Sequence, residues 1–113
     1  MNNPVPIPES FMIFGKTHHV VYDQNLAGSQ DAVGRLSYDT GLIQLLPNCA
    51  TSPRCEAEIE QTFFHELVHA ALQAVGAGKL SGDEELVDLM ASALHQAFKT
   101  ATYPAAAAKR AKR

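Results

Sequence analysis

Cysteine is scarce in this 113-residue chain, which contains only Cys49 and Cys55. Small secreted domains that depend on disulfides carry more cysteines in paired spacings, so we expect two free thiols, with a local disulfide as the alternative. No second pair of cysteines or histidines is spaced to complete a cysteine-based metal site. A disulfide scaffold and a cysteine metal centre are therefore excluded as the basis of the fold.

Long apolar runs are also missing. No stretch approaches the length of a membrane span, and the first residues have neither the basic region nor the hydrophobic region of a signal peptide. We therefore expect a cytoplasmic protein with no membrane contact. The composition, 46% hydrophobic and 19% charged, is that of an ordinary globular protein, and the length suits one domain.

Basic residues are few before the C-terminus. Up to Tyr103 the chain has five basic and twelve acidic residues, because four of the nine basic residues fall within the last five positions. Such a body does not suit nucleic acid. We expect a single domain over residues 1–103 and a flexible Ala/Lys/Arg-rich tail over residues 104–113, which at most makes a weak contact with an acidic partner or nucleic acid.

Two strand pairs are predicted in the first half of the chain. Residues 11–14 and 18–22 flank a turn at Gly15-Lys16, and residues 23–33 form a loop. Residues 34–38 and 42–46 flank Asp39-Thr40-Gly41, where the glycine supplies a positive φ. The second half is predicted to be helical. The order of elements indicates an α+β domain, with helices packed on one face of a small antiparallel sheet of about four strands.

The first helix is predicted to begin with Ser52 as N-cap and Pro53 at its first position, and to end before Gly76 and Gly78. Its apolar residues cover a wide arc, so most of it should be buried. The second helix begins near Ser81 or Asp83 and runs to about Lys99. Its predicted core stripe consists of six residues: Leu86, Met90, Ala93, Leu94, Ala97 and Phe98.

The most specific motif is His65-Glu66-Leu67-Val68-His69, inside the first helix. Positions i and i+4 share one helix face, so His65 and His69 can bind one ion. Glu66 lies beside them, where it can take a proton from a metal-bound water. The alternative interpretation is a pair of surface histidines on an amphipathic helix. We favour a zinc site.

A catalytic zinc ion usually has a third protein ligand. The second helix offers Glu84, Glu85, Asp88 and His95, of which Glu84, Asp88 and His95 lie on one stripe with Ala91. We favour Glu84 as the ligand and Asp88 as the group that hydrogen-bonds a ligand histidine. Glu85, Asp88 and His95 remain alternatives, because Ser81 and Glu84 also fit a capping box that would turn Glu84 back onto the backbone.

Together, His65-Glu66-Leu67-Val68-His69 and Asp83-Glu84-Glu85-Leu86-Val87-Asp88 resemble the minimal zincin domains of the gluzincin type. The likeness covers roughly residues 11–98 and is greatest to small metallopeptidases of phages and prophages, distantly similar to the ImmA/IrrE peptidase group. The resemblance implies that Glu84 is the third ligand and that Asp88 supports a ligand histidine. Larger gluzincins have an extra domain with an oxyanion-stabilising Tyr or His, and no residue of this chain matches it.

We therefore expect a zinc peptidase that acts on a protein or peptide, with Glu66 as general base. The alternative is a non-catalytic zinc-bound interaction module. Residues 42–46, the last strand before the motif, are expected to form an exposed sheet edge onto which the peptide adds. Adjacent His18 and His19 should face opposite sides of their strand and cannot easily share an ion. Four side chains are weak candidates for the oxyanion donor: Tyr22, Tyr38, Tyr103 and His95.

Overall fold

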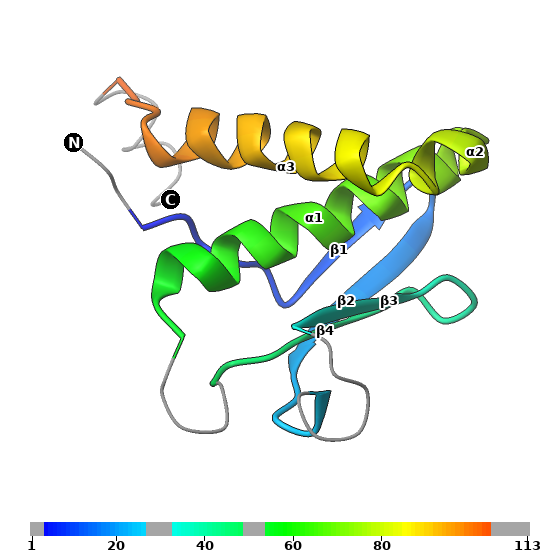
Figure 1. Cartoon of the computed structure of the whole chain (residues 1–113), viewed down its shortest axis with the longest axis horizontal. Helices are drawn as coiled ribbons and strands as arrows, with labels where there is room; N and C mark the ends of the chain where they lie inside the picture. The colour runs from blue at the N-terminus through cyan, green and yellow to red at the C-terminus, as the bar shows by residue number, and fades with distance from the viewer. Residues whose placement is uncertain (1–3, 27–32, 49–53, 105–113) are drawn as a thin grey trace.

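The computed structural model describes residues 4–26, 33–48 and 54–104 (Figure 1). Four strands precede three helices, which confirms the predicted α+β class and the order of elements. The elements are β1 (Ser10–Ile13), β2 (Lys16–Tyr22), β3 (Gly34–Ser37), β4 (Leu42–Leu45), α1 (Glu56–Ala74), α2 (Gly78–Ser81) and α3 (Glu84–Lys99). Within the described residues, no helix is both long and apolar enough to cross a membrane.

The four strands form one sheet in the order β1-β2-β4-β3. The two predicted hairpins are present, and Gly41 has the expected positive φ of 72°. The expectation of an entirely antiparallel sheet is wrong at one pairing, because β2 and β4 run parallel, with Val20 opposite Ile43. The chain between β2 and β3 is long enough to carry β3 to the far edge, so the second hairpin joins the sheet through its later strand.

β4 is therefore an interior strand, and the prediction that residues 42–46 form an exposed edge is wrong. Ile43 and Leu45 are completely buried, and a mostly apolar strand is stabilised by pairing on both sides. The more polar β3 takes the edge position, which is where strands with little apolar surface are tolerated. The free edge of the sheet next to α1 thus belongs to residues 34–37.

α1 begins later than predicted. Arg54 and Cys55 are not helical, and Cys55 is the N-cap, with its backbone N–H donating to Glu58 Oε1 at 3.2 Å. Ser52 and Pro53 lie outside the described residues. The acidic first turn and the reach of Glu58 back to Cys55 determine the start instead. The end agrees with the prediction, because Gly76 follows with a φ of 78°.

α1 lies between the sheet and α3, so the molecule has three layers (Figure 1). Eight of the nineteen residues of α1 are buried and six more are half-buried, so the prediction that most of α1 is covered is confirmed. Phe63, Phe64 and Val68 of α1 pack in one cluster with residues of the sheet and of α3. This burial holds the helix backbone rigidly, which is what a side-chain constellation built on it requires.

α3 packs through a different face from the one predicted. Val87 and Ala91 are completely buried, whereas Met90, Leu94 and Phe98 of the predicted stripe are 38–50% exposed. The polar stripe faces α1 because its side chains find partners there. His95 lies 2.8 Å from Glu60 and 3.1 Å from Gln61. Periodicity alone could not show this, because it assumes that the apolar side of a helix faces inward.

Glu60 is a buried carboxylate at the opposite end of α1 from α2. Its oxygens accept hydrogen bonds from Lys99 Nζ at 2.9 Å and from the backbone N–H of Val5 at 3.1 Å, and they contact His95. Burial raises the pKa of Glu60, but the hydrogen bonds from Lys99, His95 and Val5 outweigh it and hold the pKa below its ordinary value. Glu60 thereby ties the N-terminal segment and α3 to α1.

Candidate metal centre

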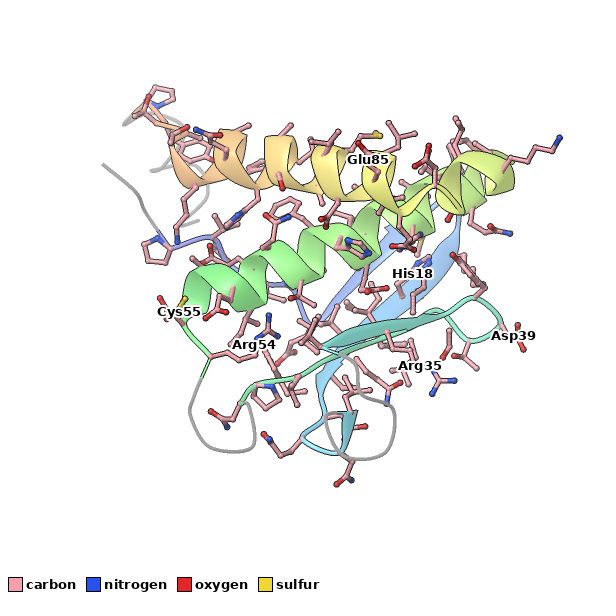
Figure 2. The ribbon with its side chains drawn as sticks, in the orientation of Figure 1. His18, Arg35, Asp39, Arg54, Cys55 and Glu85 are labelled. Atoms are coloured by element: carbon pink, nitrogen blue, oxygen red, sulfur yellow. The ribbon has the colours of Figure 1, made fainter. Side chains whose placement is uncertain are left out.

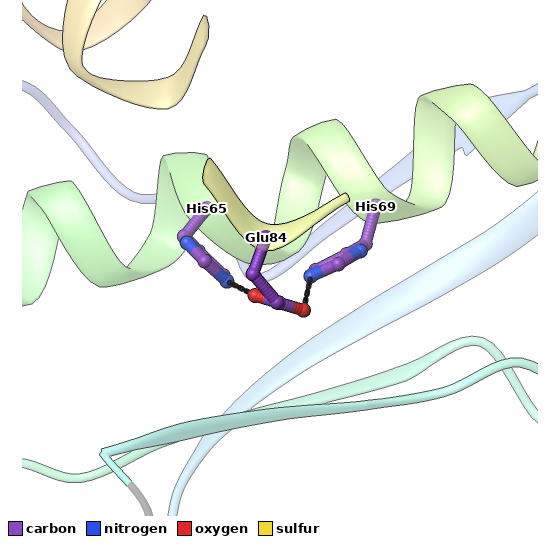
Figure 3. A group of neighbouring side chains, drawn as sticks. All are labelled: His65, His69 and Glu84. Atoms are coloured by element: carbon purple, nitrogen blue, oxygen red, sulfur yellow. Dashed lines mark hydrogen bonds and ion pairs between the residues drawn. The ribbon is translucent and has the colours of Figure 1, made fainter. Parts of the chain in front are cut away.

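His65 and His69 lie one turn apart on α1, with ring centroids 4.9 Å from each other. Glu84, the first residue of α3, projects between them (Figure 3). One carboxylate oxygen lies 3.1 Å from His65 Nε2 and the other 3.1 Å from His69 Nε2. Ligand atoms of all three residues fall within 4.8 Å of one another. The three side chains therefore form a group that could hold a metal ion.

The competing role for Glu84, a capping box with Ser81, does not occur. Asp83 is the N-cap of α3, and its carboxylate accepts a hydrogen bond from the N–H of Leu86 at 3.1 Å. The N–H of Ser81 donates to the carbonyl of Ala77. Since the helix end is capped by the preceding aspartate, the carboxylate of Glu84 can turn toward the histidines.

The outer nitrogen of each histidine also has a partner. Asp88, one turn beyond Glu84 on α3, lies 3.0 Å from His65 Nδ1, as the sequence suggested. Ser81 Oγ lies 2.9 Å from His69 Nδ1. When Nδ1 donates its proton to such a partner, the lone pair of Nε2 points at the ion. Both imidazoles are therefore oriented with Nε2 toward Glu84.

Ser81 was missed in the sequence as a partner of His69. It lies in α2, a single helical turn before Gly82 that the sequence did not predict as a separate element. Its side chain is buried, and Tyr38 Oη lies 3.2 Å from Ser81 Oγ. The distance of Ser81 from His69 in the sequence matches no known motif. The contact is visible only once the path of the chain between α1 and α3 is known.

Glu66 lies beside the group without belonging to it. The residue is 8% exposed, and burial, helped by the negative charge of Glu84 and opposed by His65, raises its pKa to about 7. β3 passes close by at Gly34, where an added Cβ would lie 3.2 Å from Glu66 Oε2 and 2.4 Å from Thr62 Cγ2. Only a glycine lets the edge strand approach this carboxylate so closely.

Burial also lowers the pKa of His69, although Glu84 acts in the opposite direction. A lowered pKa keeps the imidazole neutral near pH 7, and the neutral ring is the form that binds metals. An open cleft of about 560 Å³ lies over the group. Gly34, Leu36 and Tyr38 line it from the β3 side, opposite the two histidines of α1.

The remaining candidates lie elsewhere. His95 bonds to Glu60 and Gln61, and Glu85 is not part of the group (Figure 2). His18 is buried and stacks on Phe11 with 5.0 Å between ring centroids, while His19 is exposed, so the expected division of the two histidines is confirmed. The thiol of Cys55 is free, and Cys49 lies outside the described residues.

We call the cleft over the group of His65, His69 and Glu84 the metal cleft. Of the four oxyanion-donor candidates, Tyr38 lines it. Tyr22 and Tyr103 are more than half exposed and do not line it. Comparisons of the chain with models of protein families, with curated proteins and with solved structures found no match. The functional interpretation therefore depends on the geometry of the group formed by His65, His69 and Glu84.

Proposed function

We propose that this protein binds one zinc ion through His65, His69 and Glu84 and hydrolyses peptide bonds, with Glu66 as general base. The observation that carries the proposal is the convergence of two Nε2 atoms and a carboxylate within 4.8 Å, next to a buried carboxylate that takes no part in the convergence. A purely structural ion has no use for that second carboxylate.

Zinc suits this donor set. Two imidazoles and one carboxylate, with a fourth position left open, are the ligands of catalytic zinc sites. Softer ions favour thiolate or thioether ligands, and magnesium and calcium favour oxygen ligands alone. The open cleft above the group leaves room for a substrate at the fourth position. Asp88 and Ser81, at the outer nitrogens, supply the hydrogen bonds that fix the two imidazoles.

When bound, zinc polarises a carbonyl group and lowers the pKa of water. Glu66 accepts the proton of the attacking water and delivers it to the leaving amine. Its position one residue after His65 places the carboxylate at the cleft but outside the ligand group. Burial of Glu66 keeps bulk water from competing for that proton.

β3, not β4, is the edge strand with which a peptide substrate could pair. Residues 34–37 form the edge of the sheet and line the cleft at Gly34 and Leu36. An edge strand can pair with an extended peptide through its backbone groups. Because Gly34 lets β3 itself lie close to Glu66, a peptide paired with β3 would run near this carboxylate.

Elemental analysis of the zinc-loaded protein tests the metal part. We expect one zinc per chain in the parent, none in the protein changed at both His65→Ala and His69→Ala, and one in the control His19→Ala, which removes an exposed histidine of β2. Absence of bound metal in the parent after loading would refute the zinc site.

Hydrolysis of a mixed library of fluorogenic peptides tests the activity. The parent should cleave, and Glu66→Gln should keep its zinc while losing roughly a hundredfold or more of the rate. Zinc binding without hydrolysis of any peptide would favour the non-catalytic interaction module. Equal hydrolysis by parent and variant would remove Glu66 from the mechanism.

A further inference from the structure

A second hollow, of about 300 Å³, adjoins the metal cleft. The last turns of α1 form one wall, and the tip of the β1–β2 hairpin forms the other. Two of its lining residues, Lys16 and His18, have nitrogen-bearing polar side chains. The other six are apolar or carry only an amide or a phenol: Ile13, Phe14, Tyr38, Ala70, Gln73 and Ala74. We call it the hairpin pocket. None of the metal-binding side chains lines it, so it is not part of the ion site.

The hairpin pocket lies next to the metal cleft. Tyr38 and Gln73 line both hollows, so the two share a wall. Tyr38 is held on both sides, because Lys16 Nζ donates to its carbonyl oxygen and its hydroxyl lies 3.2 Å from Ser81 Oγ. Ser81 in turn contacts His69. The shared wall therefore stands in a fixed position relative to the ion site.

Phe14, at the mouth of the hairpin pocket, supplies a second, independent observation. It has a positive φ of 47°, the only such residue other than glycine in the described chain, and its side chain is 80% exposed. With Gly15 at φ 81°, it forms a two-residue hairpin turn in which both residues are left-handed. Such turns favour asparagine at the first position. A phenyl ring there serves neither the turn nor the core, and strained residues of this kind gather at ligand sites.

We propose that the hairpin pocket accepts an apolar side chain, of leucine to tryptophan size, from a peptide bound across the metal cleft. This inference rests on the proposed function for its substrate. Binding pockets for small groups are mostly apolar with a few polar atoms, and 300 Å³ accommodates one large side chain. Both polar basic residues of the lining have partners within the chain: Lys16 Nζ donates to the carbonyl of Tyr38, and His18 Nδ1 lies 3.2 Å from the carbonyl oxygen of Lys16. The polar rim therefore does not call for an acidic side chain.

A fluorescence titration tests the proposal directly. The chain contains no tryptophan, so emission excited at the red edge of the tryptophan band, where its three tyrosines do not absorb, reports only the peptide. The probe is a blocked hexapeptide of glycine and serine with one central tryptophan, and the reference is a dansyl-labelled peptide with serine in its place. Glu66→Gln serves as the background protein, so that cleavage of either peptide is slow compared with the measurement.

Two substitutions on α1 form a matched pair. Ala74→Leu fills the hairpin pocket, whereas Ala71→Leu places the same side chain at an exposed position that lines neither hollow. We expect Ala74→Leu to weaken binding of the tryptophan probe roughly tenfold, the scale of one lost apolar contact, and Ala71→Leu to leave it unchanged. Equal binding by the two variants would overturn the proposal.

Phe14→Asn separates a role of the ring in binding from a role in the turn, because the two roles predict different changes in stability and in probe binding. Asparagine tolerates a positive φ, so the melting temperature should rise, by roughly 2–5 °C, while binding of the tryptophan probe weakens several-fold. A variant that is more stable and binds the probe equally well would show that the ring plays no part in the pocket.

The outcomes separate this inference from the proposed function. If the tryptophan probe binds with the expected pattern and no peptide is hydrolysed, the hairpin pocket stands and the peptidase proposal fails. If the parent hydrolyses the tryptophan and serine peptides with equal kcat/KM, the activity stands and the hairpin pocket is refuted.

Discussion

Replacement of the proposed general base should make the metal-free protein more stable. Glu66→Gln keeps the shape of the side chain and removes its charge. The carboxylate is 8% exposed, and burial raises its pKa to about 7. In the unfolded chain the same group titrates at its ordinary value of 4.5. Folding therefore costs free energy wherever the carboxylate would be ionised in the unfolded chain.

The pH window follows from these two values. Below about pH 4 the side chain is neutral in both states, and parent and variant should be equally stable. Between 4.5 and about 7 the folded parent binds more protons than the unfolded chain, so its free energy of unfolding falls as pH rises. Each pKa unit corresponds to about 1.4 kcal/mol, so above pH 7 the variant should be more stable by about 3 kcal/mol.

Urea denaturation in the presence of a chelator, at several pH values from 4 to 8, measures this difference. The chelator is needed because a bound cation would reverse the local electrostatics. Glu85→Gln, at an exposed residue of α3, controls for the change in net charge and should have little effect. A stability difference between Glu66→Gln and the parent that does not change with pH would refute the reasoning, because desolvation of an ionised group requires that change.

Three further predictions concern the surroundings of the site. Gly34→Ala places a Cβ 2.4 Å from a methyl group of α1 and should lower the free energy of unfolding, measured by urea denaturation, by roughly 1–3 kcal/mol. In the control Gly78→Ala the nearest atom is 3.5 Å away, so the free energy of unfolding should not fall. Asp88→Asn and Ser81→Ala should each weaken zinc affinity by roughly 10–100-fold in a chelator competition titration. Unchanged affinity would show that the contacts of Asp88 with His65 and of Ser81 with His69 do not orient the imidazoles. The lowered pKa of Glu60 adds stability that is fully present above its unfolded value of 4.5 and is lost as pH falls through the folded pKa. Glu60→Gln should therefore flatten the acid limb of the stability profile below about pH 5, and a limb as steep as the parent's would contradict this.

Local patterns in the sequence predicted the parts of the structure that depend on neighbouring residues. Both hairpins, the end of α1 at Gly76 and the span of α3 follow from turn and capping residues a few positions apart. The convergence of His65 and His69 follows from helical spacing. Their meeting with Glu84 was expected from the stripe that Glu84 shares with Asp88 and from the resemblance to gluzincins, and the structure brings the three together.

The errors concern contacts between distant segments. The interior place of β4 depends on its parallel pairing with β2, which no local pattern specifies. α3 turns a partly polar face toward α1. Its His95 and Lys99 find a partner there in Glu60, which compensates for their burial. The contact of Ser81 with His69 depends on the path of the short connection between the helices.

The parallel pairing of β2 with β4 has a consequence for the time course of folding. The β3–β4 hairpin joins segments close in the chain and can close within roughly microseconds. Its docking on β2 pairs His19 with Leu42 across a much longer loop, and contacts of that kind form later. β3, which lines the metal cleft, reaches its place only when β4 has docked. Substitutions in the paired residues of β2 and β4 should therefore delay the formation of the cleft, although none of these residues belongs to the group of His65, His69 and Glu84.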